Sequence, residues 1–307
     1  MIYANSIIDL IGKSPLLKIN TLSNNANIYA KCEFFNPISL KDRIVLNIIN
    51  EAEKKGKVKP GDTLIECTSG NTGMALSYIS AVKGYKAILV MSEIQSIERR
   101  KIMKAFGAEI ILTPATEGTA GARKRMKAIL KENPHYFYIG QHVNMDNPKA
   151  HYKTTGPEIW SDLDGNIDIL VAALGTGGTI CGAGEYLKEK NKDVKLIAVE
   201  PENSPYISKG IFRPHRIMGT APGFVPDTLN REIIDEIMLV SEENAFSMCR
   251  KIARTEGILV GISSGAVLCI LKRLSQKKDN YCKNIIGILA DTGERYLSVE
   301  GLYNENE

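Results

Sequence analysis

Predicted strands and helices alternate along most of this chain. The segments Asp62–Cys67, Ala87–Met91 and Glu109–Thr113 are short and apolar, and each is followed by residues with helical periodicity. This alternation is typical of a parallel sheet with helices on both faces. With 307 residues, 44% of them hydrophobic, the chain can bury two ordinary cores. The sequence therefore predicts two α/β domains, each a mainly parallel twisted sheet flanked by helices.

The second half repeats the pattern with some irregularity. Strands are predicted over Ile167–Leu174, Lys195–Val199 and Asn284–Leu289, and one helix over Lys153–Asp162. The stretch Pro201–Asn230 is rich in Pro and Gly and is predicted to be irregular. An irregular stretch of this length is uncommon in a compact domain unless it has a function.

Composition and charge argue against several classes of protein. The net charge is only +4, and no aromatic residues interleave the basic run Arg123–Arg125, so no nucleic-acid partner is expected. No apolar run is long enough to span a membrane, and the N-terminus lacks a signal-peptide pattern. The six cysteines show no C-x-x-C spacing, and the four histidines are dispersed. We therefore expect reduced thiols in a cytoplasmic protein without a metal site.

A lysine at the start of a predicted helix is the first candidate for chemistry. Apolar residues repeat at helical spacing from Ile44 to Ala52, so a helix is predicted to begin near Lys41 and Asp42. Asp42 suits the first turn, where unsatisfied N–H groups carry partial positive charge. The same charge disfavours the protonated form of a lysine, and this local conflict indicates a chemical role for Lys41. A solvated lysine at a helix end is the simpler interpretation.

The glycine-rich loop Gly175–Thr179 follows a predicted strand and opens a predicted helix. Its sequence lets several backbone N–H groups approach a phosphate at the helix N-terminus. A tight turn alone would not need three glycines and two hydroxyls. A dinucleotide site is an alternative because Glu200 ends the next strand, but Ile180 occupies the third glycine position of G-x-G-x-x-G. The loop therefore suits a single phosphate monoester.

The junction Thr68–Gly73 is a second candidate anion site. Its hydroxyls, amide and glycines form a concave set of donors that suits a carboxylate. Helix capping by Ser69 or Asn71 is the simpler interpretation, but the stretch holds more polar residues than one cap needs.

The stretch Gly261–Gly265 matches the G-x-S-x-G pattern of serine hydrolases. In that family the histidine follows the serine along the chain, and here no histidine follows His215. We therefore reject a serine hydrolase and predict that Ser263 and Ser264 cap a helix.

A lysine at a helix start, a phosphate loop and a carboxylate loop together indicate a Schiff-base cofactor that acts on an amino acid. The chain resembles the cysteine synthase (O-acetylserine sulfhydrylase) family of pyridoxal-phosphate enzymes, whose type II, tryptophan synthase β-like fold is shared with cystathionine β-synthase. The resemblance covers nearly the whole chain. It rests on motifs in the same order, among them Thr68–Gly73, Ser96–Lys101, Lys153–Trp160, Gly175–Thr179, Ala198–Pro201, Gly257–Gly265 and Gly293–Ser298.

The resemblance implies a role for each matching residue. Lys41 would form the Schiff base with pyridoxal 5'-phosphate and later act as the base at the substrate α-carbon. Asn71 would contact the cofactor's phenolic oxygen, and Thr292 would place a hydroxyl against its pyridine nitrogen. The cofactor phosphate would be held by Gly175, Thr176, Gly177, Gly178 and Thr179. The substrate carboxylate would be bound by Thr68, Ser69, Asn71, Thr72 and Gln141.

The resemblance also implies the reaction. A hydroxyl at the pyridine nitrogen leaves the ring a weaker electron sink than a carboxylate would. We therefore expect elimination of a β-substituent to an aminoacrylate and addition of a nucleophile, rather than transamination. The leading reaction makes L-cysteine from O-acetyl-L-serine and sulfide. The alternatives are release of hydrogen sulfide from L-cysteine with formation of lanthionine or serine, a cystathionine β-synthase, and a non-catalytic scaffold of the same fold.

The resemblance further implies how the chain is divided and assembled. Residues 41–144 would form a smaller, mobile domain on the substrate side. Residues 1–40 and 145–307 would form a larger domain that binds the cofactor phosphate, with the active site in the cleft between the two. A cytoplasmic homodimer is expected, with a serine acetyltransferase as a possible partner.

Three departures from the family pattern surround the expected position of the β-substituent. The segment Asn36–Arg43 is one residue shorter than the family norm just before Lys41, and His142 replaces a common phenylalanine. In Gly219–Phe224, Thr220 and Pro222 add bulk and stiffness to a segment expected to line the substrate entrance. The residues expected to contact the cofactor are intact, so the sequence identifies the reaction class better than the substrate.

Overall fold

The computed structural model describes residues 3–303, which divide into two compact units. The first unit consists of the residues up to Ile11 together with Pro37–Asp146. The second consists of Gly12–Asn36 together with the residues from Asn147 onward. The chain therefore passes from one unit to the other three times. The first unit extends on both sides of the predicted limits 41–144 and includes an N-terminal segment that the sequence did not assign to it.

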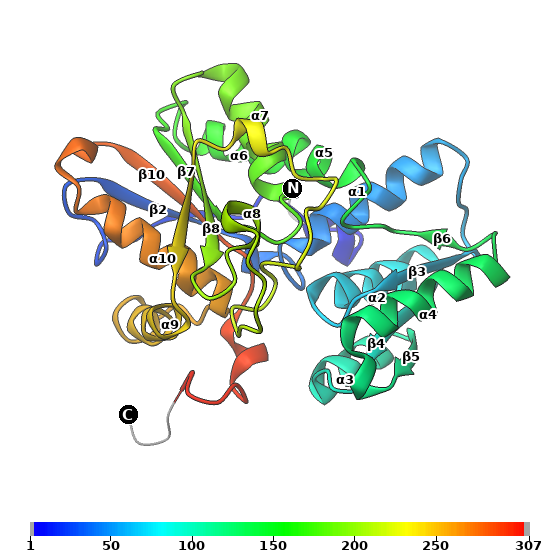
Figure 1. The fold of residues 1–307 in the computed structure, drawn as a ribbon. Coiled ribbons are helices and arrows are strands. Elements are labelled where there is room, and N and C mark those ends of the chain that lie inside the picture. The colour runs from blue at the N-terminus through cyan, green and yellow to red at the C-terminus, as the bar shows by residue number, and fades with distance from the viewer. Residues whose placement is uncertain (1–2, 304–307) are drawn as a thin grey trace. The chain divides into compact units, whose positions relative to one another are not determined.

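The first unit is built on a four-stranded, wholly parallel sheet in the order β5-β4-β3-β6 (Figure 1). Its strands are β3 (Thr63–Cys67), β4 (Lys86–Ser92), β5 (Glu109–Thr113) and β6 (Phe137–Tyr138). Its α-helices are α1 (Lys41–Lys54), α2 (Asn71–Lys83), α3 (Ile97–Ala105) and α4 (Gly118–Glu132), and its 3-10 turns are η1 (Ile7–Leu10) and η3 (Ala115–Glu117). Each strand up to β5 leads into a helix, as the alternation in the sequence predicts.

The apolar stripe of α1 fixes how the helix presents its first residue. Ile44, Val45, Ile48 and Ile49 are all fully buried, and the helix packs against α2. Burial of each such side chain contributes roughly 1.5–3 kcal/mol, so rotation of the helix about its axis is strongly opposed. The direction in which Lys41 leaves the helix is set by this packing.

The second unit is built on a six-stranded sheet in the order β1-β2-β10-β7-β8-β9. Only β1 pairs antiparallel to its neighbour; the other pairs are parallel. Its strands are β1 (Leu16–Lys18), β2 (Asn27–Cys32), β7 (Ile169–Ala173), β8 (Lys195–Pro201), β9 (Glu236–Val240) and β10 (Asn284–Leu289). Its α-helices are α6 (Thr155–Asp162), α7 (Gly178–Lys190), α8 (Tyr206–Lys209), α9 (Glu242–Glu256) and α10 (Ile262–Ser275), while α5 (Asp146–Lys153) begins at the boundary between the units. Its 3-10 turns are η2 (Glu33–Phe35), η4 (Arg231–Ile233), η5 (Lys278–Asn280) and η6 (Gly293–Tyr296).

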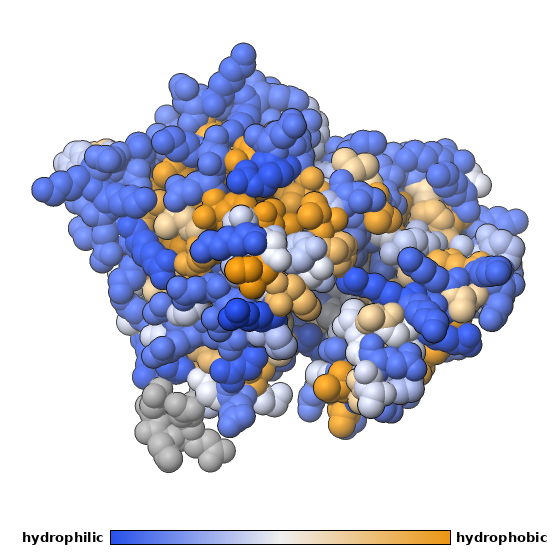
Figure 2. Space-filling view, in the orientation of Figure 1, coloured by the Kyte–Doolittle hydropathy of each residue, from blue (hydrophilic) through white to orange (hydrophobic). Residues whose placement is uncertain are grey.

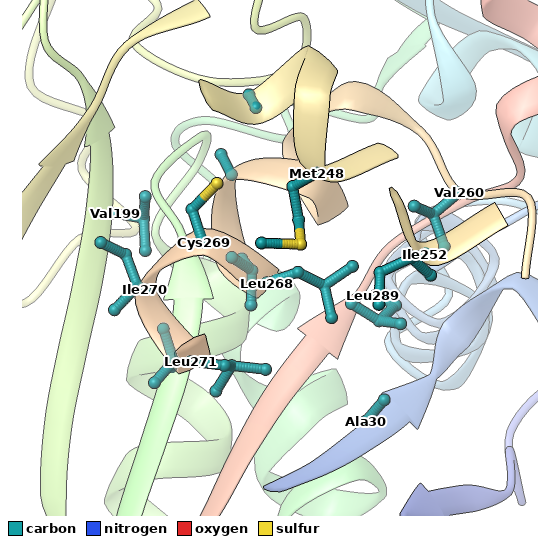
Figure 3. Packing of buried hydrophobic residues seen from close by; sticks show 14 of the residues in the cluster. Ala30, Val199, Met248, Ile252, Val260, Leu268, Cys269, Ile270, Leu271 and Leu289 are labelled. Atoms are coloured by element: carbon teal, nitrogen blue, oxygen red, sulfur yellow. The ribbon is translucent and has the colours of Figure 1, made fainter. Parts of the chain in front are cut away.

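The core of the second unit lies between its sheet and the helices α9 and α10. Figure 3 shows Ile252 of α9, Leu268 of α10 and Leu289 of β10 packed in one cluster of buried apolar side chains. The register between β2 and β10 runs from Asn27–Asn284 to Cys32–Leu289, so the start of the chain is paired with its end. This pairing holds the carboxyl ends of the parallel strands at one edge of the sheet.

The predicted fold class is confirmed, because both sheets are mainly parallel and flanked by helices. Three details differ from the sequence predictions. The helix predicted over Lys153–Asp162 begins two residues later, as α6, because Thr154 has a non-helical conformation and Lys153 is the last residue of α5. The edge strand β9 was not predicted, and a turn of helix, α8, interrupts the stretch predicted to be irregular. No helix among residues 3–303 has the length and hydropathy needed to cross a membrane.

Candidate active site

Lys41 is the first residue of α1, as the sequence predicts. Asp42 stabilises the turn that precedes Lys41. The buried Asp42 carboxylate accepts hydrogen bonds from the backbone N–H groups of Ile38 and Ser39, at 2.7 and 3.2 Å. The Lys41 N–H in turn donates to the Ser39 hydroxyl at 3.2 Å. Asp42 therefore organises the shortened turn and fixes the backbone that carries Lys41.

Tyr78 of α2 lies close to the same carboxylate. Burial, together with the nearby Asp42 charge, raises the pKa of the Tyr78 hydroxyl well above its usual value. The hydroxyl therefore stays protonated. The Asp42 carboxylate therefore lies beside both the turn before Lys41 and the helix that begins at Asn71.

The predicted carboxylate loop Thr68–Gly73 forms the junction between β3 and α2. The N-cap of α2 is Gly70, and no side chain caps the helix. The simpler interpretation, capping by Ser69 or Asn71, is therefore wrong. Since the first N–H groups of a helix attract negative charge and no side chain caps them, this end of α2 is suited to a substrate carboxylate.

Hydrogen bonds hold the side chains of this loop in place. The Thr68 hydroxyl accepts from the Gly70 N–H at 3.3 Å, and the Ser69 hydroxyl donates to the Gln95 amide oxygen at 2.9 Å. The Thr72 hydroxyl donates to the Gln141 amide oxygen at 2.7 Å. The structure therefore brings Thr72 and Gln141 together, as expected for residues that bind one group.

Gln95 and Glu66 are two residues of this region that the sequence analysis did not identify. Gln95 lies just after β4, the parallel neighbour of β3, so its side chain reaches Ser69 from the same edge of the sheet. A polar residue after an adjacent parallel strand was the available signal. Glu66, on β3, accepts from the Gln141 N–H at 3.0 Å and from the Cys67 N–H at 2.8 Å. Its burial raises the pKa of its carboxyl to about 7.

His142 is electrostatically coupled to Lys41. Burial, followed by the positive charges of Lys41 and Arg123, lowers the pKa of the His142 imidazole to about 3. The imidazole is therefore neutral at physiological pH. A neutral ring near Lys41 can donate or accept one hydrogen bond without adding charge to the site.

The predicted phosphate loop Gly175–Thr179 connects β7 to α7. Gly177 is the N-cap of α7 and has φ +77°, a conformation that favours glycine. A Cβ atom at Gly175 would collide with the Gly219 carbonyl oxygen, and one at Gly178 with the Asn147 side chain. The N-cap residue Gly177 has no side chain to cap α7, so the start of the helix lies open to the loop. These features fit a phosphate group, because backbone N–H groups and the helix dipole both favour an anion there.

The two threonines of this loop are buried and hydrogen-bonded. The Thr176 hydroxyl accepts from the Asn147 amide at 3.1 Å and from the Gly178 N–H at 3.3 Å. The Thr179 hydroxyl lies 3.2 Å from His151 Nε2, and His151 Nδ1 lies 2.8 Å from the Thr155 hydroxyl. Asn147 and His151 are thus supporting residues that carried no signal in the sequence, because they precede the loop by almost thirty positions.

Thr292 lies just after β10, the parallel neighbour of β7. Its hydroxyl accepts from Arg295 Nη1 at 3.3 Å, and its backbone forms a bridge with Val260. The neighbouring Asp291 carboxylate accepts a 2.5 Å hydrogen bond from the Tyr296 hydroxyl. The carboxylate beside Thr292 is therefore engaged with a tyrosine inside the unit.

Ser263 and Ser264 do not cap α10, so that prediction is wrong. The N-cap is Gly261, and no side chain caps the helix. The Ser264 hydroxyl instead accepts from the Ala290 N–H at 2.9 Å. It thereby fixes the end of β10, immediately before Asp291 and Thr292.

The segment Gly219–Phe224 packs beside the phosphate loop. The Ala221 N–H donates to the Leu174 carbonyl at 2.9 Å, and the Thr220 hydroxyl donates to the Ile217 carbonyl at 2.5 Å. Gly219 and Ala221 both have positive φ. The departure at Thr220 therefore stabilises the turn that leads into this segment, because its hydroxyl bonds the carbonyl of Ile217 just before it.

Comparisons with known proteins agree with this geometry. Residues 7–289 match the model of the family described as pyridoxal-phosphate dependent enzyme. The chain is 45% identical to a cysteine synthase of Staphylococcus aureus over 299 residues, which is 96% of each chain. A cysteine synthase of Entamoeba histolytica has a similar structure, with a TM-score of 0.95, 43% identity and coverage of 98% of this chain and 91% of that one.

A third relative is a hydrogen sulfide-producing enzyme from Fusobacterium nucleatum. Its structure matches with a TM-score of 0.91 and 42% identity, over 96% of this chain and 98% of that one. The matches span nearly all of the chain, and the glycine loop at the start of α7 fits the cofactor phosphate. The chain belongs to the family of pyridoxal-phosphate dependent enzymes.

Proposed function

We propose that this enzyme makes L-cysteine and acetate from O-acetyl-L-serine and sulfide. The observation that carries the proposal is the Thr72–Gln141 pair at the uncapped start of α2, because it prepares a site for an amino-acid carboxylate. The 45% identity to a cysteine synthase supports the same reaction. The phosphate loop, with three sterically constrained glycines, supports the assignment of the cofactor.

Each residue of the two sets has a distinct task in this proposal. The uncapped helix start, with Thr68, Ser69, Thr72 and Gln141, binds and orients the substrate carboxylate. Asn71 would contact the phenolic oxygen of the cofactor. Its phosphate would be held by Gly175, Thr176, Gly177, Gly178 and Thr179. Lys41 would hold the cofactor in the resting enzyme, and its Nζ atom would then remove the proton from the substrate α-carbon.

Bound pyridoxal phosphate supplies an electron sink that makes the α-proton acidic and the β-substituent a leaving group. Thr292 would present a hydroxyl to the pyridine nitrogen, and a hydroxyl would not force protonation of that nitrogen. This choice favours loss of the β-substituent over transamination. The neutral His142 ring, near Lys41, adds no charge that would compete for the substrate carboxylate.

A second candidate reaction uses L-cysteine as the first substrate, releases hydrogen sulfide and forms lanthionine or serine. Two observations favour it. The similar Fusobacterium nucleatum protein is a hydrogen sulfide-producing enzyme. In addition, His142 and the turn at Thr220 differ from the family pattern where the β-substituent is expected.

One experiment distinguishes the two reactions. The purified enzyme is given either O-acetyl-L-serine with sulfide or L-cysteine alone, and the initial rates of cysteine formation and sulfide release are compared. A higher kcat/KM for cysteine formation supports the leading reaction, whereas sulfide release that far exceeds it would establish the second. Lys41→Ala is the control, because both rates should fall by about 10²–10⁴-fold when the base is removed.

The assembly and location of the enzyme are part of the proposal. We expect a homodimer, since large apolar side chains of the second unit, such as Phe212 (57% exposed) and Val225 (59% exposed), would gain from being covered. Figure 2 shows apolar residues gathered on part of the visible face. We also expect a cytoplasmic enzyme that a serine acetyltransferase can bind. Sedimentation of the enzyme, alone and with that partner, measures both assembly states.

A further inference from the structure

Glu66 is a buried carboxylate at the centre of the parallel sheet of the first unit. It belongs to β3 and is only 1% exposed. Burial of a carboxylate is costly unless several donors compensate it, so a glutamate in this strand needs a specific reason. None of the tasks in the proposed function uses it.

The donors around Glu66 come from the ends of two neighbouring strands. Oε1 accepts from the Cys67 N–H at the end of β3, at 2.8 Å. Oε2 accepts from the Gln141 N–H after β6, at 3.0 Å, and the Gly140 N–H also bonds the carboxylate. Successive N–H groups that converge in this way form a concave anion site in the backbone.

Gly140 has the backbone conformation that brings these N–H groups to the Glu66 carboxylate. Its φ is +66°, and a Cβ atom there would approach the Tyr138 ring at 3.2 Å and Val143 at 3.1 Å. Only a glycine therefore turns the chain sharply enough after β6 for the N–H groups of Gly140 and Gln141 to reach the same carboxylate.

Two links thus join the same pair of segments. At the level of the side chains, the Thr72 hydroxyl bonds the Gln141 amide at 2.7 Å. At the level of the backbone, Glu66 bonds the N–H of Gln141 and that of Cys67, the residue just before Thr68. Above the Glu66 pKa of about 7 the carboxylate is charged, and a hydrogen bond to a charged group is stronger than a neutral one, so the backbone link is then the stiffer of the two.

We propose that Glu66 is a positioning residue for the substrate, which holds the Gln141 backbone against the end of β3 and so sets the spacing of the groups that bind the substrate carboxylate. This inference rests on the proposed function, because it assigns Gln141 and the loop after β3 to the substrate. Glu66 acts through these residues and does not touch the substrate itself.

The Glu66 carboxylate can accept hydrogen bonds at both ends, whereas the amide of a glutamine can accept at only one. Both of its oxygens accept, and each is used by a different strand end. In Glu66→Gln one oxygen becomes an NH₂ group, which would face a backbone N–H as donor against donor. One of the two strand ends must then move away.

The test compares Glu66→Gln with a control in the same sheet. Thr113→Val removes a hydroxyl that is buried on β5 and makes no hydrogen bond within residues 3–303. We expect E66Q to raise the KM for O-acetyl-L-serine roughly tenfold or more, as for loss of a hydrogen bond to a charged group, while kcat changes far less. T113V should leave KM unchanged. The visible absorbance of the bound cofactor and the melting temperature report whether each variant is folded and loaded.

A second readout does not depend on turnover. L-Alanine has the carboxylate and amine of a substrate but no leaving group, and its dissociation constant is obtained from the change in visible absorbance on titration. E66Q should weaken alanine binding by a factor similar to the rise in KM. If the wild-type enzyme fails to convert O-acetyl-L-serine, the proposed function fails, but alanine binding still tests the role of Glu66.

A double variant tests whether Glu66 acts through Gln141. If it does, E66Q added to Gln141→Ala should raise KM by a smaller factor than E66Q alone does, because the Gln141 side chain that Glu66 positions through the backbone is already gone. Fully additive effects would overturn the proposal, and so would an unchanged KM and alanine affinity in E66Q. A joint fall of kcat, cofactor content and melting temperature without a specific rise in KM would also overturn it. Should E66Q not fold, Glu66→Asp keeps the charge, retracts both oxygens and should give a smaller rise in KM.

Discussion

Thr72 and Gln141 are 69 residues apart in the chain, yet the Thr72 hydroxyl donates a 2.7 Å hydrogen bond to the Gln141 amide oxygen. The bond fixes the orientation of the Gln141 side-chain amide. A carboxylate at the start of α2 can then be bound by backbone N–H groups and by this amide together.

Thr72→Val keeps the shape of the side chain and removes this bond. The Gln141 amide then loses its orientation, and we expect the KM for the amino-acid substrate to rise about tenfold, which corresponds to about 1.4 kcal/mol. Initial-rate kinetics measure this change. Thr72→Ser retains the hydroxyl and should restore most of the affinity; an equal loss in both variants would contradict a role for the bond.

Gly177→Ala changes the phosphate loop. The new Cβ would meet Leu229 at 2.7 Å and would impose a positive φ on alanine. We expect loss of cofactor affinity by about tenfold or more, measured by equilibrium dialysis of the cofactor with absorbance detection. Gly257→Ala is the matched control, because Gly257 has φ +68° but nothing within 4 Å of its Cβ position. It should share the backbone strain of a positive φ without the clash, and should bind the cofactor normally.

Asp42→Ala removes both hydrogen bonds that hold the turn before Lys41. Since the two bonds involve a charged acceptor, we expect a loss of roughly 2–4 kcal/mol of folding free energy and a fall in kcat, because the Lys41 backbone is no longer fixed. Denaturant unfolding and single-turnover rates measure the two effects. Asp42→Asn keeps an acceptor oxygen, so its stability and kcat should lie between those of Asp42→Ala and the wild type. A wild-type kcat in both variants would refute the role of Asp42.

His142→Gln should change how stability depends on pH. The pKa of His142 is lowered to about 3 in the folded protein, whereas an unfolded histidine titrates near 6.5. The unfolded chain therefore binds more protons between these values, so His142 stabilises the fold above pH ~6.5, and this contribution, about 2–4 kcal/mol at most, is lost as the pH falls toward 3. Urea unfolding at several pH values should show a smaller acid loss in the variant.

Glu66 should make folding stability change with pH in the opposite direction to His142, over an overlapping pH range. Its pKa rises to about 7 on folding, from the ordinary value of 4.5, so the folded protein binds more protons between these values. The contribution of Glu66 to stability therefore decreases as the pH rises from 4.5 to 7, and E66Q should gain stability relative to the wild type over that range. If E66Q and H142Q responded to pH with the same sign, one of the two assignments would be wrong.

The sequence predicted those parts of the site that depend on local chain geometry. Lys41 at a helix start, the glycine loop and the polar stretch after β3 each combine a strand end, a helix start and unusual residue types within a few positions. These signals are local, and the structure reproduces the elements that contain them.

The supporting residues could not be predicted in the same way, because their partners are distant in the chain. Glu66 bonds a backbone N–H 75 residues away, and Asn147 bonds a hydroxyl 29 residues away. Ser264 shows the same limit in a different form. Its local sequence favours a helix cap, but a backbone N–H 26 residues later takes the hydroxyl instead.

The register between β2 and β10 has a consequence for the order in which the protein can fold during synthesis. β2 ends at Cys32, and the strand that pairs with it on its inner side begins only at Asn284. The intervening Pro37–Asp146 is contiguous and carries the whole sheet of the first unit, so that sheet can form while the ribosome is still translating the rest. β1 and β2 must wait as a two-stranded hairpin, which is marginally stable alone, until β10 emerges near the end of translation. A nascent chain arrested shortly before Asn284 should therefore protect the first unit from proteases and leave the second unit susceptible to them.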